Sequence, residues 1–222
     1  MLRTLRTQGQ ALAVRRTSPH GPGPTGPGDP RSAAAYVHLV GTAAGPMGGD
    51  VVEVRLAVGP GAQLHVAGVA ATVVLPSRSQ ARSELVVELD VAAGGRLVCA
   101  LPPVVVTGRA ELQAATRVRL VEDGQVRLVE HVRLGRYAEP GGWWRARLDV
   151  TRDGAPLLRQ TTTLGEVADH GGPRDLRSVL DTADPAQDAE GQDAGDAGVQ
   201  DDQARTVVLR PATGGSLVVT LG

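Results

Sequence analysis

Apolar and polar residues alternate through much of the middle of this chain. From Val51 to Val58 every second residue is apolar, and Glu53 and Arg55 lie between them. A strand places successive side chains on opposite faces, so this alternation predicts strands with one buried and one solvated face. Glycine-rich turns such as Gly59-Pro60-Gly61 follow these segments. The pattern predicts an all-β protein.

The strands and turns recur. The leucines that follow successive glycine turns are spaced 33, 15 and 16 residues apart: Leu64, Leu97, Leu112 and Leu128. This spacing indicates a unit of about 16 residues with one landmark missing near residue 80. We interpret each unit as a strand, a tight turn and a strand, so that mostly antiparallel hairpins stack into an extended scaffold. The expected pairs are Val51–Val58 with Gln63–Val74, Ser83–Val91 with Arg96–Leu101, Ala110–Val121 with Gln125–Leu134, Trp143–Val150 with Pro156–Leu164, and Thr206–Arg210 with Ser216–Leu221.

Helix is scarce in the pattern: we expect at most one or two short helices, with Arg174–Leu180 as the candidate. The composition divides the chain into four parts. Residues 1–32 form an N-terminal segment with a Pro/Gly-rich loop, and residues 33–165 form the β-repeat scaffold domain. Residues 166–205 hold 11 acids and 3 arginines and read as an acidic low-complexity linker. Residues 206–222 form a C-terminal hairpin that could dock on the scaffold.

Composition removes several function classes. The chain has 222 residues and a net charge of −1, and it has no Lys, which excludes a Schiff-base lysine and a Walker-type phosphate site. Arginines alternate along the strands without aromatic residues among them, which argues against a nucleic-acid partner. The single cysteine, Cys99, lies in an apolar run and is expected to be a buried hydrophobe. No secretion signal or membrane span is evident, so we expect a cytoplasmic protein with no membrane partner.

Candidate chemistry is sparse. The five histidines lie at least 18 residues apart, so no local zinc motif exists. Glu130-His131 is the best adjacent pair for a metal, but neighbouring strand residues point to opposite faces and could share an ion only at a bulge or a sheet rim. No nucleophile elbow is present. The sequence therefore predicts a protein without an active site, not an enzyme.

An ordered set of turns and strands carries a family resemblance over roughly residues 33–165. The set is Gly45-Pro46-Met47-Gly48-Gly49-Asp50, Gly59-Pro60-Gly61-Ala62-Gln63-Leu64, Val69-Ala70-Ala71-Thr72-Val73, Gly94-Gly95-Arg96-Leu97, Pro102-Pro103 through Gly108-Arg109-Ala110, Val129-Glu130 ahead of Leu134-Gly135-Arg136, and Arg147-Leu148-Asp149-Val150 through Asp153-Gly154-Ala155-Pro156-Leu157. In this order and spacing the chain resembles the urease accessory protein UreD family, called UreH in some systems.

The resemblance implies a mostly β, non-catalytic scaffold that binds the urease apoprotein and, through the accessory protein UreF, recruits the GTPase UreG. The assembly delivers nickel to urease, and the scaffold is thought to pass it through an internal water-filled tunnel. No tightly bound cofactor is implied, only transient nickel. By motif position Asp50 and Glu130 match family-typical acids, so they become candidate ligands of a weak nickel path. His131 is a local addition to that set.

The sequence departs from the family pattern in two places, and two other interpretations of its function remain open. The Pro/Gly-rich loop lies where the family has strands, and the acidic stretch interrupts its C-terminal part. One alternative is a cupin-like metal-dependent β-barrel enzyme, although such a site clusters histidines and this chain offers one per region. The other is a β-repeat structural or interaction module. A tightly bound metal would favour the enzyme, and self-assembly without partners would favour the module.

Overall fold

The structure, a computed structural model, describes residues 12–17, 34–165, 173–183, 205–210 and 214–222. All regular secondary structure in these ranges is β-strand, which confirms the all-β prediction. The described part of the chain contains no helix long and apolar enough to cross a membrane. The strands are β1 (Leu12–Thr17), β2 (Ala34–Gly41), β3 (Val51–Val58), β4 (Gln63–Gly68), β5 (Thr72–Val74), β6 (Arg82–Val91), β7 (Arg96–Ala100), β8 (Val104–Val106), β9 (Glu111–Leu120), β10 (Gln125–Leu134), β11 (Trp143–Arg152), β12 (Ala155–Leu164), β13 (Asp175–Asp181), β14 (Arg205–Leu209) and β15 (Ser216–Leu221).

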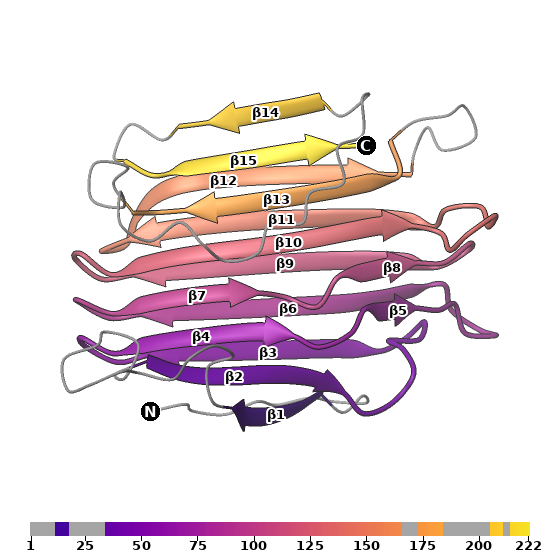
Figure 1. Ribbon diagram of the computed structural model, residues 1–222. Coiled ribbons are helices and arrows are strands. Elements are labelled where there is room, and N and C mark those ends of the chain that lie inside the picture. Colours follow the sequence, from indigo (N-terminus) through magenta and orange to yellow (C-terminus); the bar gives the residue numbers. More distant parts are fainter. Residues whose placement is uncertain (1–11, 18–33, 166–172, 184–204, 211–213) are drawn as a thin grey trace.

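The strands form two layers (Figure 1). Sheet A has five strands in the order β12-β11-β9-β6-β3. Sheet B has ten strands; its main path is β1-β2-β4-β7-β10-β13-β15-β14, and β5 and β8 extend it beside β10. The apolar faces of the two sheets meet and enclose one core.

The central repeats cross between the sheets instead of forming hairpins. Strand β3 lies in sheet A, and β4, which follows it after the Gly59–Gly61 turn, lies in sheet B. Equivalent strands of successive repeats then pair in parallel: Gln63 is the partner of Arg96, and Arg96 of Gln125. One full coil therefore spans about 30 residues, and the 16-residue unit is half of a coil. The stack is β-solenoid-like.

This pairing differs from the antiparallel hairpins expected for the three central repeats, and the reason is burial. Val54 and Leu56 on β3 and Leu64 and Val66 on β4 are all buried. When the chain folds over at the turn, both apolar faces meet across the core, whereas a flat hairpin would place them side by side in one sheet.

Two of the expected hairpins are confirmed. Strands β11 and β12 pair antiparallel across Asp153 and Gly154, whose φ angles of 50° and 79° are those of a tight two-residue hairpin turn. Strands β14 and β15 also pair antiparallel. The predicted helix at Arg174–Leu180 is wrong, because Asp175–Asp181 forms strand β13 between β10 and β15.

The turns at one end of the coils are bonded to one another. The Gly61 N–H donates to Ala93 O at 3.0 Å, and the Gly94 N–H donates to the Asp123 carboxylate at 2.6 Å. In the next turn the Glu122 N–H donates to Asp153 Oδ1 at 2.9 Å. These bonds satisfy turn amides that would otherwise depend on water.

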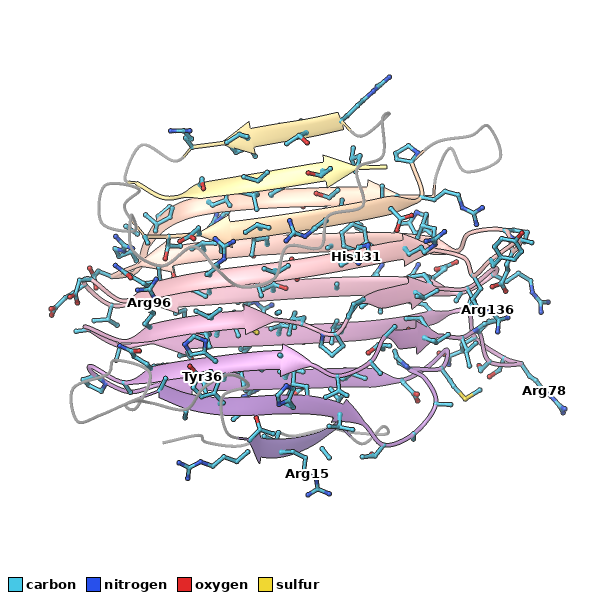
Figure 2. All side chains as sticks on the ribbon, viewed as in Figure 1. Arg15, Tyr36, Arg78, Arg96, His131 and Arg136 are labelled. Atoms are coloured by element: carbon cyan, nitrogen blue, oxygen red, sulfur yellow. The ribbon has the colours of Figure 1, made fainter. Side chains whose placement is uncertain are left out.

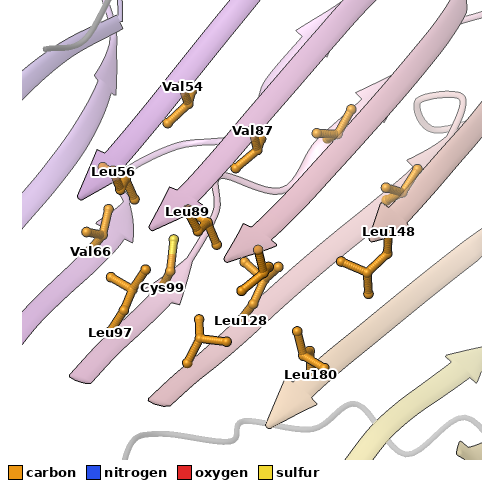
Figure 3. Packing of buried hydrophobic residues seen from close by; sticks show 14 of the residues in the cluster. Val54, Leu56, Val66, Val87, Leu89, Leu97, Cys99, Leu128, Leu148 and Leu180 are labelled. Atoms are coloured by element: carbon orange, nitrogen blue, oxygen red, sulfur yellow. The ribbon is translucent and has the colours of Figure 1, made fainter. Parts of the chain in front are cut away.

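Valine and leucine fill the core, as the absence of Phe and Ile requires (Figure 3). Leu89 from sheet A and Leu97 and Cys99 from sheet B have no exposed surface. Burying such a side chain stabilises the fold by roughly 1.5–3 kcal/mol. The interior is therefore held by many small aliphatic contacts.

All four predicted segments contribute strands to sheet B, and the scaffold segment 33–165 supplies β2, β4, β7 and β10 among them. Strand β1 comes from residues 1–32 and pairs with β2, and β13 comes from residues 166–205 and pairs with β10. The C-terminal strand β15 pairs with β13. The Pro/Gly-rich loop and most of the acidic stretch lie outside the described residues, and the domain limits stay a prediction.

The outward side of sheet A, which we call face A, carries a ladder of charges. One row crosses all five strands in strict alternation of sign: Arg55, Glu88, Arg117, Asp149 and Arg159. Glu88 accepts contacts from Arg55 at 3.3 Å, Arg117 at 3.5 Å and Arg119 at 3.7 Å. Face A thus pairs its own charges.

Candidate functional site

Glu130 is a carboxyl group placed between the two sheets. It occupies an inward position of β10, where its neighbours on the same face are the buried Leu128 and Val132. Thr116 Oγ1 of sheet A donates to Glu130 Oε1 at 3.1 Å, and Ser178 Oγ of sheet B donates to Oε2 at 3.4 Å. The Glu130 carboxyl therefore accepts hydrogen bonds from hydroxyl groups of both sheets.

Burial raises the pKa of Glu130, and the hydrogen bonds from Thr116 and Ser178 only partly oppose that rise. Among the described residues, no arginine is a hydrogen-bond partner of Glu130. The environment thus favours the neutral carboxylic acid more than water does. A metal ion would have to displace that proton before the carboxylate could bind it.

Glu130 borders two cavities. The larger has a volume of about 300 Å³ and extends from the loop around Pro46 to Trp144, between walls of mostly valine, leucine and alanine. The smaller has a volume of about 20 Å³, and its walls include Thr116, Ser178 and Gln160. Glu130 and Trp144 line both cavities, so the carboxyl stands at the boundary between an apolar space and a polar one.

The smaller cavity contains a buried acceptor. Gln160 Nε2 donates to Thr162 Oγ1 at 2.9 Å, while Gln160 Oε1 is buried without a protein hydrogen-bond partner in the described part of the chain. A cavity of this volume accommodates about one water molecule. Polar groups from β9, β10, β12 and β13 thus converge on one small space.

His131 lies on the other side of the same strand. Its side chain is 45% exposed, and Nε2 lies 3.4 Å from Asp175 Oδ1 on β13. Arg133 also contacts Asp175, at 3.8 Å. His131 is among the residues that border the larger cavity, but its ring pairs on the outward face (Figure 2). The structure does not bring its imidazole to the Glu130 carboxyl.

Asp50 has a structural task in the turn before β3. Its Oδ2 accepts the Met47 N–H at 2.9 Å, and its own N–H donates to Met47 O at 2.8 Å. The turn needs glycine at position 48, because a Cβ there would lie 1.9 Å from Gln80 O. Asp50 is not among the residues that line either cavity.

The remaining candidates have local partners. Tyr36 stacks on His65 with ring centroids 4.7 Å apart, and burial together with the charge of Arg96 lowers the pKa of His65. Thr17 Oγ1 and His38 Nδ1 are 2.8 Å apart. Burial and the nearby Glu130 raise the pKa of Cys99 to about 12, so the thiol is inert as a nucleophile. Within the described ranges no three His, Cys, Asp or Glu residues are grouped to hold a metal.

Sequence reasoning singled out Glu130 but missed the groups around it. Thr116, Ser178, Gln160 and Trp144 each occupy an inward position of a strand. A polar residue at an inward position of an alternating strand was the available signal. Because the four lie on four different strands, the pattern along the chain could not show that they meet.

The described part of the chain is an all-β, β-solenoid-like protein: the coil is its building unit, and the Glu130 carboxyl lies between its two sheets. The comparison with known families is specific: the description "UreD urease accessory protein" matches residues 2–182. The chain belongs to the UreD family of urease accessory proteins.

Individual relatives support the same family assignment. The chain is 43% identical over 166 residues to urease accessory protein UreD 1 of Saccharopolyspora erythraea, covering 71% of this chain and 65% of that protein. It is 38% identical over 213 residues to UreD of Frankia alni, covering 86% and 68%. It is 36% identical over 160 residues to UreD of Streptomyces avermitilis, covering 72% of this chain and 59% of that protein. The chain thus spans about two thirds or less of the length of these relatives.

Proposed function

We propose that this chain acts in urease maturation as a non-catalytic cytoplasmic scaffold that binds the urease apoprotein and helps deliver nickel to it. UreF and, through UreF, the GTPase UreG complete the proposed assembly. The observation that carries the proposal is the family match over residues 2–182. The all-β stack supports it, because a rigid scaffold is what a partner-assembling protein needs.

The proposed nickel path passes Glu130. The carboxyl lies between the larger cavity and the polar smaller one, where Gln160 and the hydroxyls of Thr116 and Ser178 supply further oxygen atoms. An oxygen-rich set that must lose a proton binds Ni²⁺ weakly, which suits a group that has to release its cargo. Weak binding of this kind is expected to fall as pH is lowered.

Asp50 and His131 are also part of the proposed nickel path, and a different observation supports each of them. His131 lies beside Asp175, so an imidazole and a carboxylate are available together on the outward face. Asp50 uses one carboxylate oxygen for the Met47 N–H, and its other oxygen could meet an ion or a partner at the turn. Both would act before or after the buried segment of the path.

The test is an activation assay. Urease subunits and the other accessory proteins are co-expressed in nickel medium with or without this chain, and ammonia release and urease nickel content are measured. Activity that depends on the chain supports the scaffold role. Equal activity in both arms, with this chain soluble and present, would sink the proposal.

The nickel path is tested with Glu130→Gln in the same assay. Glu84→Gln, an exposed outward change on sheet A, is the matched control. We expect Glu130→Gln to lower urease nickel content severalfold while the chain still co-purifies with urease, and the control to behave as wild type. Full nickel loading with Glu130→Gln would remove Glu130 from the path and leave the scaffold role intact.

A further inference from the structure

The larger cavity opens to solvent at one end. Its walls there come from two short stretches of chain, residues 41–44 where β2 ends and residues 70–71 just before β5. The small residues of these stretches that line the cavity are themselves exposed: Gly41, Ala43, Ala44, Ala70 and Ala71. Because glycine and alanine fill little space, they leave an entrance to the cavity. We call these five residues the mouth.

The side chains behind the mouth are mostly aliphatic. Sheet A contributes Val54, Leu85 and Leu112 to the walls, and sheet B contributes Leu39 and Val104. An engineered apolar cavity of about 150 Å³ stays dry and binds benzene. The space here, at about 300 Å³, is larger and lies within the range of small-molecule sites. Such a space favours hydrocarbon over water.

The cavity has one polar group away from the mouth, the carboxyl of Glu130. The hydrogen bonds from Thr116 and Ser178 fix the direction of this carboxyl, and Trp144 lines the cavity beside it. Burial raises the pKa of Glu130, so the protonated form has an O–H that it can donate. The carboxyl can therefore exchange a hydrogen bond with an uncharged oxygen.

An aliphatic space with a single oriented polar group is the usual composition of a small-molecule site, in which the polar group fixes the orientation of the ligand. A charged ligand does not suit this cavity. Among the described residues that line it, the titratable side chains are Glu130 and His131, and the His131 ring pairs with Asp175 on the outward side. A charged molecule would lose its hydration there without gaining an opposite charge.

We propose that the larger cavity is a binding site for a small uncharged molecule with an aliphatic chain and one terminal oxygen. The molecule enters through the mouth, its chain lies along the valine and leucine walls, and its oxygen meets the Glu130 carboxyl. This inference rests on the cavity and not on the proposed function. The two are linked at Glu130, since a bound molecule would block a nickel path that passes the same carboxyl.

The experiment titrates the purified, nickel-free full chain with 1-octanol in a calorimeter. We expect saturable binding of one molecule per chain. Octanoate at pH 8 has the same chain length but carries a charge, and we expect it to bind at least about tenfold more weakly. Equal binding of the two compounds, or octanol uptake without saturation, would overturn the proposal.

A pair of neighbouring substitutions locates the site. Ala114 of β9 lines the cavity, so Ala114→Leu fills part of the space, whereas Ala115→Leu makes the same change at the next residue, on face A. We expect Ala114→Leu to weaken octanol binding at least about tenfold and Ala115→Leu to bind as wild type. Circular dichroism confirms that both variants are folded.

A second variant keeps the test decisive should Ala114→Leu fold poorly. Ala44→Phe narrows the mouth at an exposed position, and we expect octanol to associate severalfold more slowly, as recorded by the fluorescence of Trp144. The proposal fails if wild type does not bind octanol, or if Ala114→Leu and Ala44→Phe both behave as Ala115→Leu. These measurements contain no urease and no nickel, so their failure is distinct from a failure of the activation assay.

Discussion

The outward faces of the two sheets are both built from alternating β-strands and differ in their side chains. In the middle of face A, Glu88 is contacted by three arginines. In the middle of the outward side of sheet B, which we call face B, Val129 lies between Ala100 and Val179. On face A the charges pair within the sheet, which suits contact with water. Apolar side chains at the surface instead gain free energy when other atoms cover them.

The comparison shows which positions of such a fold can change: the outward ones can vary more freely than the inward ones. Inward residues of both sheets share one core, so changing them alters the whole stack. Outward residues of the two sheets do not share that core, so the two faces can carry different side chains. If the two faces differ in this way, one substitution should affect them differently.

The same substitution is expected to have opposite consequences on the two faces. Val129→Arg places a cation beside Arg127 on β10 and between the apolar Ala100 and Val179 of the neighbouring strands, and we expect a cost of about 2 kcal/mol in the free energy of unfolding. Val86→Arg on β6 lies opposite Glu53 and between Glu84 and Glu88, so its cost should stay within about 0.5 kcal/mol. Urea denaturation measures both, and equal losses would contradict the distinction.

The charge ladder is expected to depend on its central carboxylate. Glu88→Gln leaves Arg55, Arg117 and Arg119 without that carboxylate, and we expect a loss of about 1 kcal/mol at low ionic strength. The loss should shrink in 1 M salt, where screening acts over about 3 Å. Asp181→Asn, with Arg127 as its ion-pair partner on face B, is the control and should cost less. A salt-independent loss at Glu88 would show that packing, not charge, is responsible.

The carboxyl between the sheets should give a smaller effect that depends on pH. Burial raises the pKa of Glu130 above its ordinary value of 4.5, so the folded state holds the proton more tightly than the unfolded chain. Wild-type stability should therefore fall as pH rises from 4.5 through the raised pKa, and Glu130→Gln should remove that fall. Melting temperatures at pH 4.5 and pH 8 measure it. Parallel curves for the two proteins would contradict the buried-carboxyl account.

Much of the local structure was predictable because it depends on neighbouring residues. The alternation from Val51 to Val58 predicted strand β3 within its observed bounds, and Asp153-Gly154 predicted the β11–β12 hairpin. Strand pairing was not predictable in the same way. An alternating strand has the same pattern whether its partner follows directly or lies a full coil away, so the crossing between sheets was missed.

The error at Arg174–Leu180 has a physical cause as well. Leu176, Val179 and Leu180 fit the spacing of a helix face, while Leu176, Ser178 and Leu180 fit a strand. The segment is a strand because it pairs with β10 on one side and with β15 on the other. Glu130 could be read as inward from Leu128 and Val132, but the hydroxyls that meet its carboxyl come from strands whose pairing the pattern does not contain.

The bonded turns limit how such a protein can change length over evolution. Because the carboxylates of Asp123 and Asp153 hold the amides of the preceding turns, one residue added or removed there would break the match between neighbouring coils. Whole coils of about 30 residues could be inserted or lost without that penalty. Insertions and deletions among relatives should therefore avoid this end of the stack, or arrive in complete coils.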